Sequence, residues 1–323
     1  MDIFLASLIS SVLLAAMPLV LAGMGELITE KSGVLNLGVE GMMLMGAVSS
    51  FAVTLWTGSA WLGVLAGIAA GVLSAALFAF LVVRLMTNQV ATGLALTILM
   101  TGLSALLGIK FVGQSVDGFS AVSIPVLADI PVVGEFFKQS LLAYASIALV
   151  VFLAWWLYHT PSGLLLRAVG ESPNSAHAIG FDVVKVRYGA TILGGALCGL
   201  AGTFIALVQF KAWQEGITGG VGWIAVALVV FATWHPSRLI FGALLFGLMR
   251  SMGFAVQAAN AFVQELLEKS ASVTHVIIGF LTNSQVLNAL PYLATVVILC
   301  WISRDWQKIK LNAPASLGQP YND

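Results

Sequence analysis

Apolar residues in this chain form long runs that alternate with short polar segments. A helix needs about 20 mainly apolar residues to cross the hydrocarbon core of a membrane, and most of these runs approach that length. A shorter run is also expected to cross, because Gly219, Gly220 and Gly222 interrupt its start and the polar segment 235–238 follows it. About nine transmembrane helices are therefore predicted, at 3–22, 34–56, 61–83, 90–108, 140–157, 188–210, 221–234, 239–259 and 286–302.

The domain organisation follows from the same pattern. Residues 1–302 are predicted to form one all-α transmembrane domain, in which the short apolar run at 273–282 is re-entrant or interfacial. Residues 303–323 are polar, and we expect them to form a cytoplasmic tail.

Glycine spacing predicts where helices pack most closely. Gly63, Gly67 and Gly71 recur at every fourth position of one run, and Gly195 and Gly199 do so in another. Such spacing leaves a smooth helix face that a neighbouring backbone can approach. We expect tight helix–helix contacts along both faces.

The polar segment 158–187 lies between two long apolar runs. Within it, Ser172 can cap a helix, Pro173 suits the first helical position, and Gly180 can adopt the left-handed conformation that ends a helix. These residues predict a short helix over 173–179. Its basic flanks, Arg167, Lys185 and Arg187, favour a docking element for a soluble partner, and the alternative is a helix that rests on lipid headgroups.

Composition supports a chain that is surrounded by membrane lipid. Hydrophobic residues make up 59% and charged residues 9%, whereas an ordinary soluble domain has about 25% charged residues. The net charge is zero, so no nucleic-acid partner is expected. The first apolar run lacks the positively charged start of a secretory signal and is predicted to be a retained helix. Cys198 and Cys300 lie in apolar runs and are expected to be packing residues.

The distribution of Lys and Arg predicts the orientation, because cytoplasmic loops carry an excess of both. If the polar segment 158–187 is cytoplasmic, the N-terminus lies outside and nine basic residues face the cytoplasm against four outside. The cytoplasmic set is Lys31, Arg84, Arg167, Lys185, Arg187, Arg238, Arg304, Lys308 and Lys310.

Sequence motifs argue against an enzyme. No phosphate-binding GxxxxGK[ST] motif is present, so any ATP hydrolysis must take place on another subunit. The four histidines, His159, His177, His235 and His275, lack metal-ligand spacing, and no nucleophile elbow occurs. We expect no catalytic residue, no metal and no cofactor.

Two charged residues lie inside predicted spans, Glu40 in the second and Arg250 in the eighth, and Asn36 also interrupts the apolar run of the second. Asn36 and Glu40 are four residues apart and would share a helix face. Ionisable side chains in a membrane usually face protein or water, so Glu40 and Arg250 are candidates for a pair in the translocation pathway. The alternative is that Asn36 and Glu40 only hold helices together near the cytoplasmic side.

Three motifs carry a family resemblance: GVLNLGVEGMMLMGA (33–47), LLRAVGESPNSAHAIGFDVVKVR (165–187) and APASLGQPY (313–321). They resemble permease subunits of ABC importers in the ribose/branched-chain amino acid permease superfamily, above all the purine-nucleoside and simple-sugar permeases. The segment 258–285 departs from the usual pattern by being longer and less regular.

The resemblance implies a set of partners and a role for the polar segment. The partners are an ABC ATPase subunit, a second permease subunit that is often a paralogue, and an external substrate-binding protein. The polar segment would be the coupling loop that contacts the ATPase. Its coupling residues would be Ser172, Pro173, Asn174, Ala176, His177, Ala178, Ile179 and Gly180.

We therefore predict the permease subunit of an ATP-driven importer, which moves nucleosides or related small sugars inward by alternating access. The resemblance implies a multi-pass protein of the plasma membrane, the inner membrane of a bacterial cell. Two alternatives stay open, besides a structural membrane scaffold. One is a branched-chain amino acid permease of the same superfamily. The other is an ion-coupled secondary transporter, in which Glu40 would titrate and the polar segment would be a passive loop.

Overall fold

The computed structural model describes residues 2–125, 127–128, 130, 133–267, 293 and 312–321, with the backbone alone in 2–5 and 253–267. The described chain is predominantly α-helical, and its only sheet is a small hairpin of two antiparallel strands, β1 (Ala121–Ser123) and β2 (Lys138–Ser140). The helices are α1 (Asp2–Lys31), α2 (Val39–Thr57), α3 (Ala60–Ala79), α4 (Gln89–Gly108), α5 (Leu141–His159), α6 (Pro161–Glu171), α7 (Pro173–Ala178), α8 (Val183–Phe204), α9 (Val221–Phe231) and α10 (Pro236–Leu267). The π-helical segments Phe80–Arg84 and Ile205–Phe210 extend α3 and α8. The 3₁₀ turn Ile109–Phe111 follows α4, and the 3₁₀ turn Val133–Phe137 lies between β1 and β2.

Six helical segments among the described residues are long and apolar enough to cross a membrane. They correspond to the first six predicted spans, and they confirm an all-α polytopic membrane protein. They are Ala6–Lys31, Val39–Thr57, Ala60–Arg84, Gln89–Phe111, Leu141–His159 and Val183–Phe210.

The predicted total of nine is not confirmed. The seventh predicted span forms α9, which has 11 residues. At about 1.5 Å per residue it is too short to cross a hydrocarbon core of about 30 Å. The eighth lies in α10, while 273–282, 286–302 and most of the irregular segment 258–285 lie outside the described residues.

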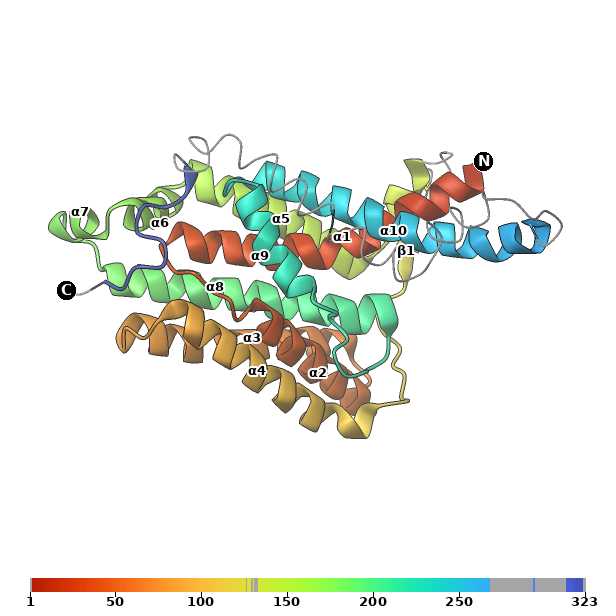
Figure 1. Ribbon diagram of the computed structural model, residues 1–323, viewed down its shortest axis with the longest axis horizontal. Helices are drawn as coiled ribbons and strands as arrows, with labels where there is room; N and C mark the ends of the chain where they lie inside the picture. Colours follow the sequence, from red (N-terminus) through yellow and green to blue (C-terminus); the bar gives the residue numbers. More distant parts are fainter. Residues whose placement is uncertain are drawn as a thin grey trace.

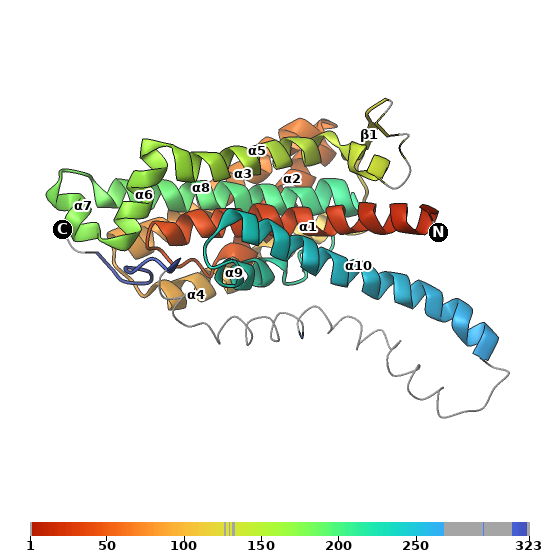
Figure 2. The ribbon, with the colours of Figure 1, turned by 90° about the horizontal axis from the view of Figure 1, so that it is seen from above.

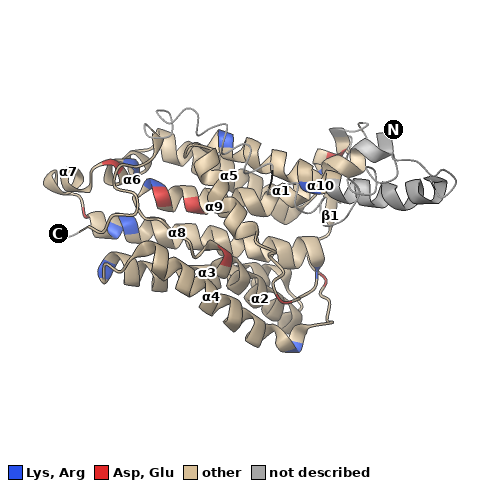
Figure 3. Ribbon diagram, in the orientation of Figure 1, with Lys and Arg blue, Asp and Glu red and all other residues tan. Residues whose placement is uncertain are grey.

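The long helices lie roughly along one axis, with α1 and α8 through the middle (Figures 1 and 2). The helix α8 packs against α1, α2 and α3, while α10 and α9 pack on α1. The short helices α6 and α7 lie at one end together with the C-terminus, and the N-terminus lies at the other end (Figure 1). Lys, Arg, Asp and Glu are sparse along the long helices (Figure 3).

The predicted glycine faces meet where α3 contacts α8. A Cβ atom built on Gly71 would lie 2.2 Å from the Gly195 carbonyl oxygen and 2.8 Å from the Gly199 Cα atom. Gly199 also faces Gly46 of α2, because a Cβ on Gly46 would lie 2.4 Å from its carbonyl oxygen. These backbones touch at distances that no side chain would permit, which confirms the predicted close packing.

Candidate functional site

The connection between α1 and α2, residues 32–38, is non-helical and largely buried. Unwound backbone at this depth is tolerated only where other groups satisfy its N–H and C=O groups. Two side chains of α4 do so: Gln89 Oε1 accepts a hydrogen bond from the Leu35 N–H at 2.7 Å, and Thr97 Oγ1 donates to the Leu37 carbonyl at 2.9 Å. The second span therefore begins at Val39, five residues later than predicted from the apolar run.

Asn36 shapes this α1–α2 linker. Its side-chain Oδ1 accepts a hydrogen bond from the Gly38 N–H at 2.8 Å, a local turn that competes with helix formation. Its own N–H donates to Glu26 Oε1 at 2.9 Å. The prediction that Asn36 and Glu40 share a helix face is wrong, because Asn36 precedes the first turn of α2.

Glu40 lies in the first turn of α2, and its carboxylate accepts hydrogen bonds from the start of α9. Its Oε1 accepts hydrogen bonds from Thr218 Oγ1 at 2.5 Å and from the Gly220 N–H at 2.9 Å, and its Oε2 accepts one from the Gly222 N–H at 2.6 Å. Gly220 and Gly222 form the N-terminus of α9. A carboxylate at a helix N-terminus satisfies N–H groups that have no partner in the helix and offsets the helix dipole. One buried carboxylate therefore serves the starts of α2 and α9.

Gly222 is required for this contact. A Cβ atom there would lie 2.6 Å from the Glu40 Cα atom, so no side chain fits between the two helices. The other candidate, Arg250, lies in α10 and is partly buried. The hydrogen bonds from Thr218, Gly220 and Gly222 already satisfy the Glu40 carboxylate, and its pairing with Arg250 stays a prediction.

Two further carboxylates near the linker were missed by sequence reasoning. Glu26 and Glu30 are fully buried on α1, where Glu26 accepts the Asn36 N–H and Glu30 accepts a hydrogen bond from Trp234 Nε1. Neither Glu26 Oε2 nor Glu30 Oε1 has a hydrogen-bond partner among the described residues. The first apolar run ends near residue 22, so it does not indicate that α1 continues to Lys31 and includes both acids. Their four-residue spacing on a helix was the available signal.

At the end that carries α7, the predicted short helix is present. Ser172 Oγ accepts a hydrogen bond from the Ser175 N–H at 3.4 Å, Pro173 occupies the first helical position, and Gly180 has a φ of +93°. The helix ends at Ala178, one residue earlier than expected. Ala176 points inward and packs with Val169 and Val183. The exposed surface is formed by Asn174, His177, Ala178, Ile179 and Phe181.

The three basic flanks of α7 have different environments. Lys185 is exposed and forms an ion pair with Asp182 at 2.8 Å, and the hydrogen bonds from Lys185 lower the pKa of Asp182. Arg167 lies over the Tyr158 ring, 4.8 Å from its centroid. Arg187 is only 3% exposed. Its prediction as part of a docking surface is wrong, because it lies one turn inside α8 and faces the protein interior.

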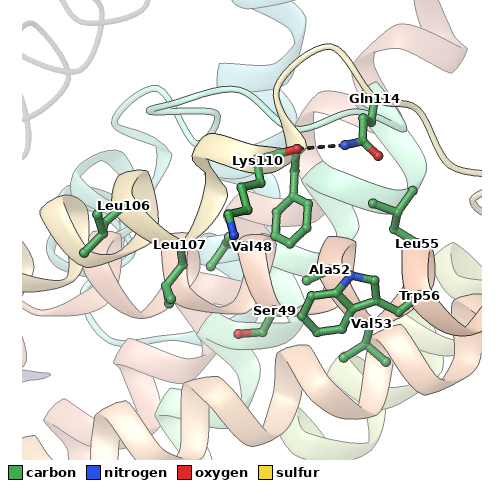
Figure 4. A pocket seen from close by; sticks show the side chains of 11 residues that line it. Val48, Ser49, Ala52, Val53, Leu55, Trp56, Leu106, Leu107, Lys110 and Gln114 are labelled. Atoms are coloured by element: carbon green, nitrogen blue, oxygen red, sulfur yellow. Dashed lines mark hydrogen bonds between the residues drawn. The ribbon is translucent and has the colours of Figure 1, made fainter.

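A cavity of about 860 Å³ lies between α2 and the end of α4, remote from α7. Trp56 and Phe111 supply aromatic surface, and Ser49, Lys110 and Gln114 supply polar groups. The Lys110 side chain extends into the cavity toward Leu107 and Val48 (Figure 4). No sequence motif linked these residues, since they come from separate helices. In the part of the chain that the structure describes, no cluster of His, Cys, Asp and Glu could hold a metal ion.

Comparisons with known proteins place these features in one family. Residues 8–300 match the family described as "Branched-chain amino acid transport system / permease component". A Haloferax volcanii protein that is inferred to be a glucose ABC transporter permease is 42% identical over 99% of this chain and 98% of its own length. A guanosine ABC transporter permease of Bacillus subtilis is 33% identical over 78% of this chain and 84% of its own length. A nucleoside ABC transporter permease of Lactococcus lactis subsp. cremoris is 31% identical over 76% and 81%.

The family match covers most of the chain, and the six apolar helices agree with a multi-pass membrane protein. Permeases of ABC importers work with an ATPase and a substrate-binding partner and carry out transport rather than covalent chemistry. The chain therefore belongs to the family of ABC importer permease components described for branched-chain amino acid transport.

Proposed function

We propose that this chain forms the membrane pathway of an ATP-driven importer for nucleosides or small sugars. The observation that carries the proposal is the set of relatives that match along most of their length, named for glucose, guanosine and nucleosides. Glucose and nucleosides share a hydroxylated sugar ring. A solute of this kind needs hydrogen-bond partners and aromatic surface rather than a fixed charge.

The helix α7 is the proposed contact with the ATPase. It is capped at its start by Ser172 and ended by Gly180, so its backbone has a defined position outside the transmembrane helices. Ile179 is 73% exposed and Phe181 is 43% exposed beside it. Exposed apolar side chains directly after a capped short helix suit insertion into a groove of a soluble protein. The proposed coupling surface also includes Ser172, Pro173, Asn174, His177 and Ala178, while the buried Ala176 packs the helix against the protein beneath it.

The junction at Glu40 is the proposed moving part of the pathway. Two helices, α2 and α9, begin inside the bundle and are held together by three hydrogen bonds to one carboxylate. Helices that begin within a membrane protein are common where transporters bind or admit solutes. Alternating access would move α9 relative to α2 around this carboxylate.

The remaining partners follow from the same proposal. A second permease subunit, which is often a paralogue, would complete the pathway. An external binding protein would deliver the solute at the end remote from α7, where the cavity lined by Trp56 and Lys110 lies.

A branched-chain amino acid importer is the second candidate. It is favoured by a Methanocaldococcus jannaschii relative named as a probable branched-chain amino acid permease, which is 30% identical but covers only 52% of this chain. The ion-coupled secondary transporter is not retained, since the family consists of permease components of ABC importers.

Uptake of labelled guanosine, glucose and leucine by cells with and without this chain tests the proposal. We expect loss of the chain to abolish ATP-dependent uptake of guanosine or glucose and to leave leucine uptake unchanged. Loss of leucine uptake alone would establish the second candidate instead. Unchanged uptake of all three solutes would contradict both.

A further inference from the structure

The end of the chain, residues 312–321, packs against the helix ends near α7 (Figure 1); we refer to it as the C-terminal strap. Lys31 Nζ at the end of α1 donates to the Asn312 carbonyl at 2.9 Å. The Ser316 N–H donates to the Gly170 carbonyl of α6 at 3.0 Å, and the Gly318 N–H donates to the Gly33 carbonyl in the α1–α2 linker at 3.2 Å. The strap therefore joins α6 to the end of α1 and the linker that follows it, two regions that are far apart in the sequence.

Arg187 anchors the strap. Its Nε donates to the Ser32 carbonyl at 3.2 Å, its Nη2 to Ser316 Oγ at 2.9 Å and its Nη1 to the Gln319 carbonyl at 3.0 Å. The guanidinium also lies 5.9 Å from the centroid of the Tyr321 ring.

The strap offsets the free-energy cost of burying the Arg187 guanidinium, because it supplies hydrogen-bond acceptors. The ion pairs found among the described residues do not include Arg187, which is only 3% exposed. A buried charge that loses its hydrogen-bond partners destabilises a protein strongly. The strap supplies two of the three acceptor groups and the aromatic ring. Its attachment is therefore specific, unlike that of a loose tail.

The strap is close-packed against the α1–α2 linker and α6. Gly33 has a φ of +92°, and a Cβ atom there would lie 2.5 Å from Ser316 Oγ and 2.7 Å from Arg187 Nη2. A Cβ on Gly170 would lie 2.1 Å from the Lys31 carbonyl oxygen. Ser316 Oγ in turn donates to the Gly170 carbonyl at 2.7 Å. Because these groups are close-packed, a shift of one displaces the others.

The far end of the strap reaches α7. Tyr321 packs on the small cluster formed by Val169, Ala176 and Val183, and its ring lies 6.3 Å from that of His177. A continuous set of contacts thus runs from α7 through Tyr321 and Arg187 to the α1–α2 linker. The same linker leads through Asn36 into the first turn of α2, where Glu40 holds α9.

We propose that Arg187 and the C-terminal strap are positioning elements that fix α7 to the α1–α2 linker, so that a displacement of α7 moves Glu40 and the starts of α2 and α9. The inference rests on the proposed role of α7 as the contact with the ATPase. Neither Arg187 nor the strap needs to touch the solute. A strap that only stabilises the fold would leave the ratio of transport to ATP hydrolysis unchanged, and this difference is measurable.

The first experiment measures hydrogen exchange in the purified full-length chain in lipid nanodiscs. Tyr321→Ala and Arg187→Lys should each accelerate exchange of the peptide 173–182 by about fivefold, the change expected when roughly one net hydrogen bond or packing contact is lost. Arg84→Lys makes the same substitution at an exposed arginine of the predicted cytoplasmic side and should exchange as the wild type does. Wild-type exchange in both strap variants would overturn the proposal.

The second experiment measures labelled guanosine and glucose uptake, together with ATP hydrolysis, by the assembled importer in proteoliposomes. Arg187→Lys should keep the ATPase bound and lower uptake per ATP hydrolysed by about tenfold, because an ammonium cannot replace the three-point guanidinium contact. Ser316→Ala, a milder change, should lower the ratio less and serves if Arg187→Lys does not fold. A wild-type ratio in every folded strap variant would overturn the proposal. Uptake by the wild type without ATP hydrolysis would instead overturn the proposed function. The hydrogen-exchange experiment would still test whether the strap fixes α7.

Discussion

The α1–α2 linker (32–38) and the segment around α7 (172–182) both interrupt the long helices, but they satisfy their backbone groups differently. The α7 segment uses its own neighbours: Ser172 caps the helix, Gly180 ends it, and Asp182 caps α8. The linker depends on distant residues, including Gln89 and Thr97. A locally capped segment can stand at the surface and meet a partner, whereas a segment held by distant side chains is tied to the helices around it. Variants of the α7 segment should therefore have local effects, whereas variants at the contacts between distant residues should also disturb the helices around them.

The largest effect is expected at Glu40, where removal of one side chain frees the donors of a distant segment. Glu40→Ala should destabilise the chain by about 3 kcal/mol or more, because Thr218 and the Gly220 and Gly222 N–H groups lose a charged acceptor in a buried site. Thermal unfolding in detergent and solute uptake would both report the loss. Glu215→Ala removes an exposed acid from the segment that precedes α9 and should behave as the wild type does. Equal melting temperatures for the two variants would refute the role of Glu40.

Gly222→Ala tests the same junction by adding atoms instead of removing them. The new methyl group would meet the Glu40 backbone at 2.6 Å, and such overpacking should cost about 2 kcal/mol. Gly102→Ala is the matched control, since a Cβ atom there meets nothing within 4 Å inside α4. It should be neutral or stabilising, as expected for Ala in a helix interior. If Gly222→Ala were equally harmless, the close approach of α2 and α9 would not be a requirement.

Gly180→Ala addresses the locally supported segment. Its φ of +93° lies in the region that side chains disfavour, while a Cβ atom there meets nothing within 4 Å. The cost should be about 1 kcal/mol and confined to the end of α7. We expect weaker co-purification of the ATPase with unchanged membrane insertion. Gly189→Ala, at a helical glycine of α8 with equal space, is the control. A loss of insertion in Gly180→Ala would show that this segment is not independent of the transmembrane helices.

The smallest effect concerns the cap of α8. Asp182 Oδ1 accepts a hydrogen bond from the Lys185 N–H at 2.9 Å, and its pKa is lowered by the hydrogen bonds from Lys185. Because the folded-state pKa lies below the ordinary value of about 3.9, the contribution to stability is complete above that value. It is lost as the pH falls through the lower folded-state pKa. Exchange of the Lys185 amide should therefore accelerate at acid pH in the wild type, beyond the intrinsic rate, and Asp182→Asn should lose this extra dependence.

Sequence reasoning succeeded where the determinants are local. Ser172, Pro173 and Gly180 predicted α7 to within one residue, because caps and left-handed glycines act on neighbouring backbone. The first six spans were likewise visible as apolar runs. It fails where burial is decided by distant residues: no apolar pattern marks Glu26 and Glu30 as buried, Arg187 is buried although a basic flank is expected on the surface, and α9 is shorter than the predicted span.

These failures share a physical reason. A charged residue is expected at the surface because of its free-energy cost in lipid, but hydrogen bonds from other elements offset part of that cost. The acceptors of Arg187 include Ser316 and Gln319, more than a hundred residues away in the sequence. The donors to Glu40 are 178 to 182 positions further along the chain. No local pattern marks such pairs.

The distance between Glu40 and α9 along the chain has a consequence for biosynthesis. The N-terminus of α9 lacks an acceptor of its own, because Gly220 makes no side-chain cap, and uncapped N–H groups are costly in hydrocarbon. Synthesis proceeds from the N-terminus, so α2 and its carboxylate emerge well before α9. The acceptor for the start of α9 is therefore already present when α9 is synthesised, and in the reverse order α9 would emerge before its acceptor.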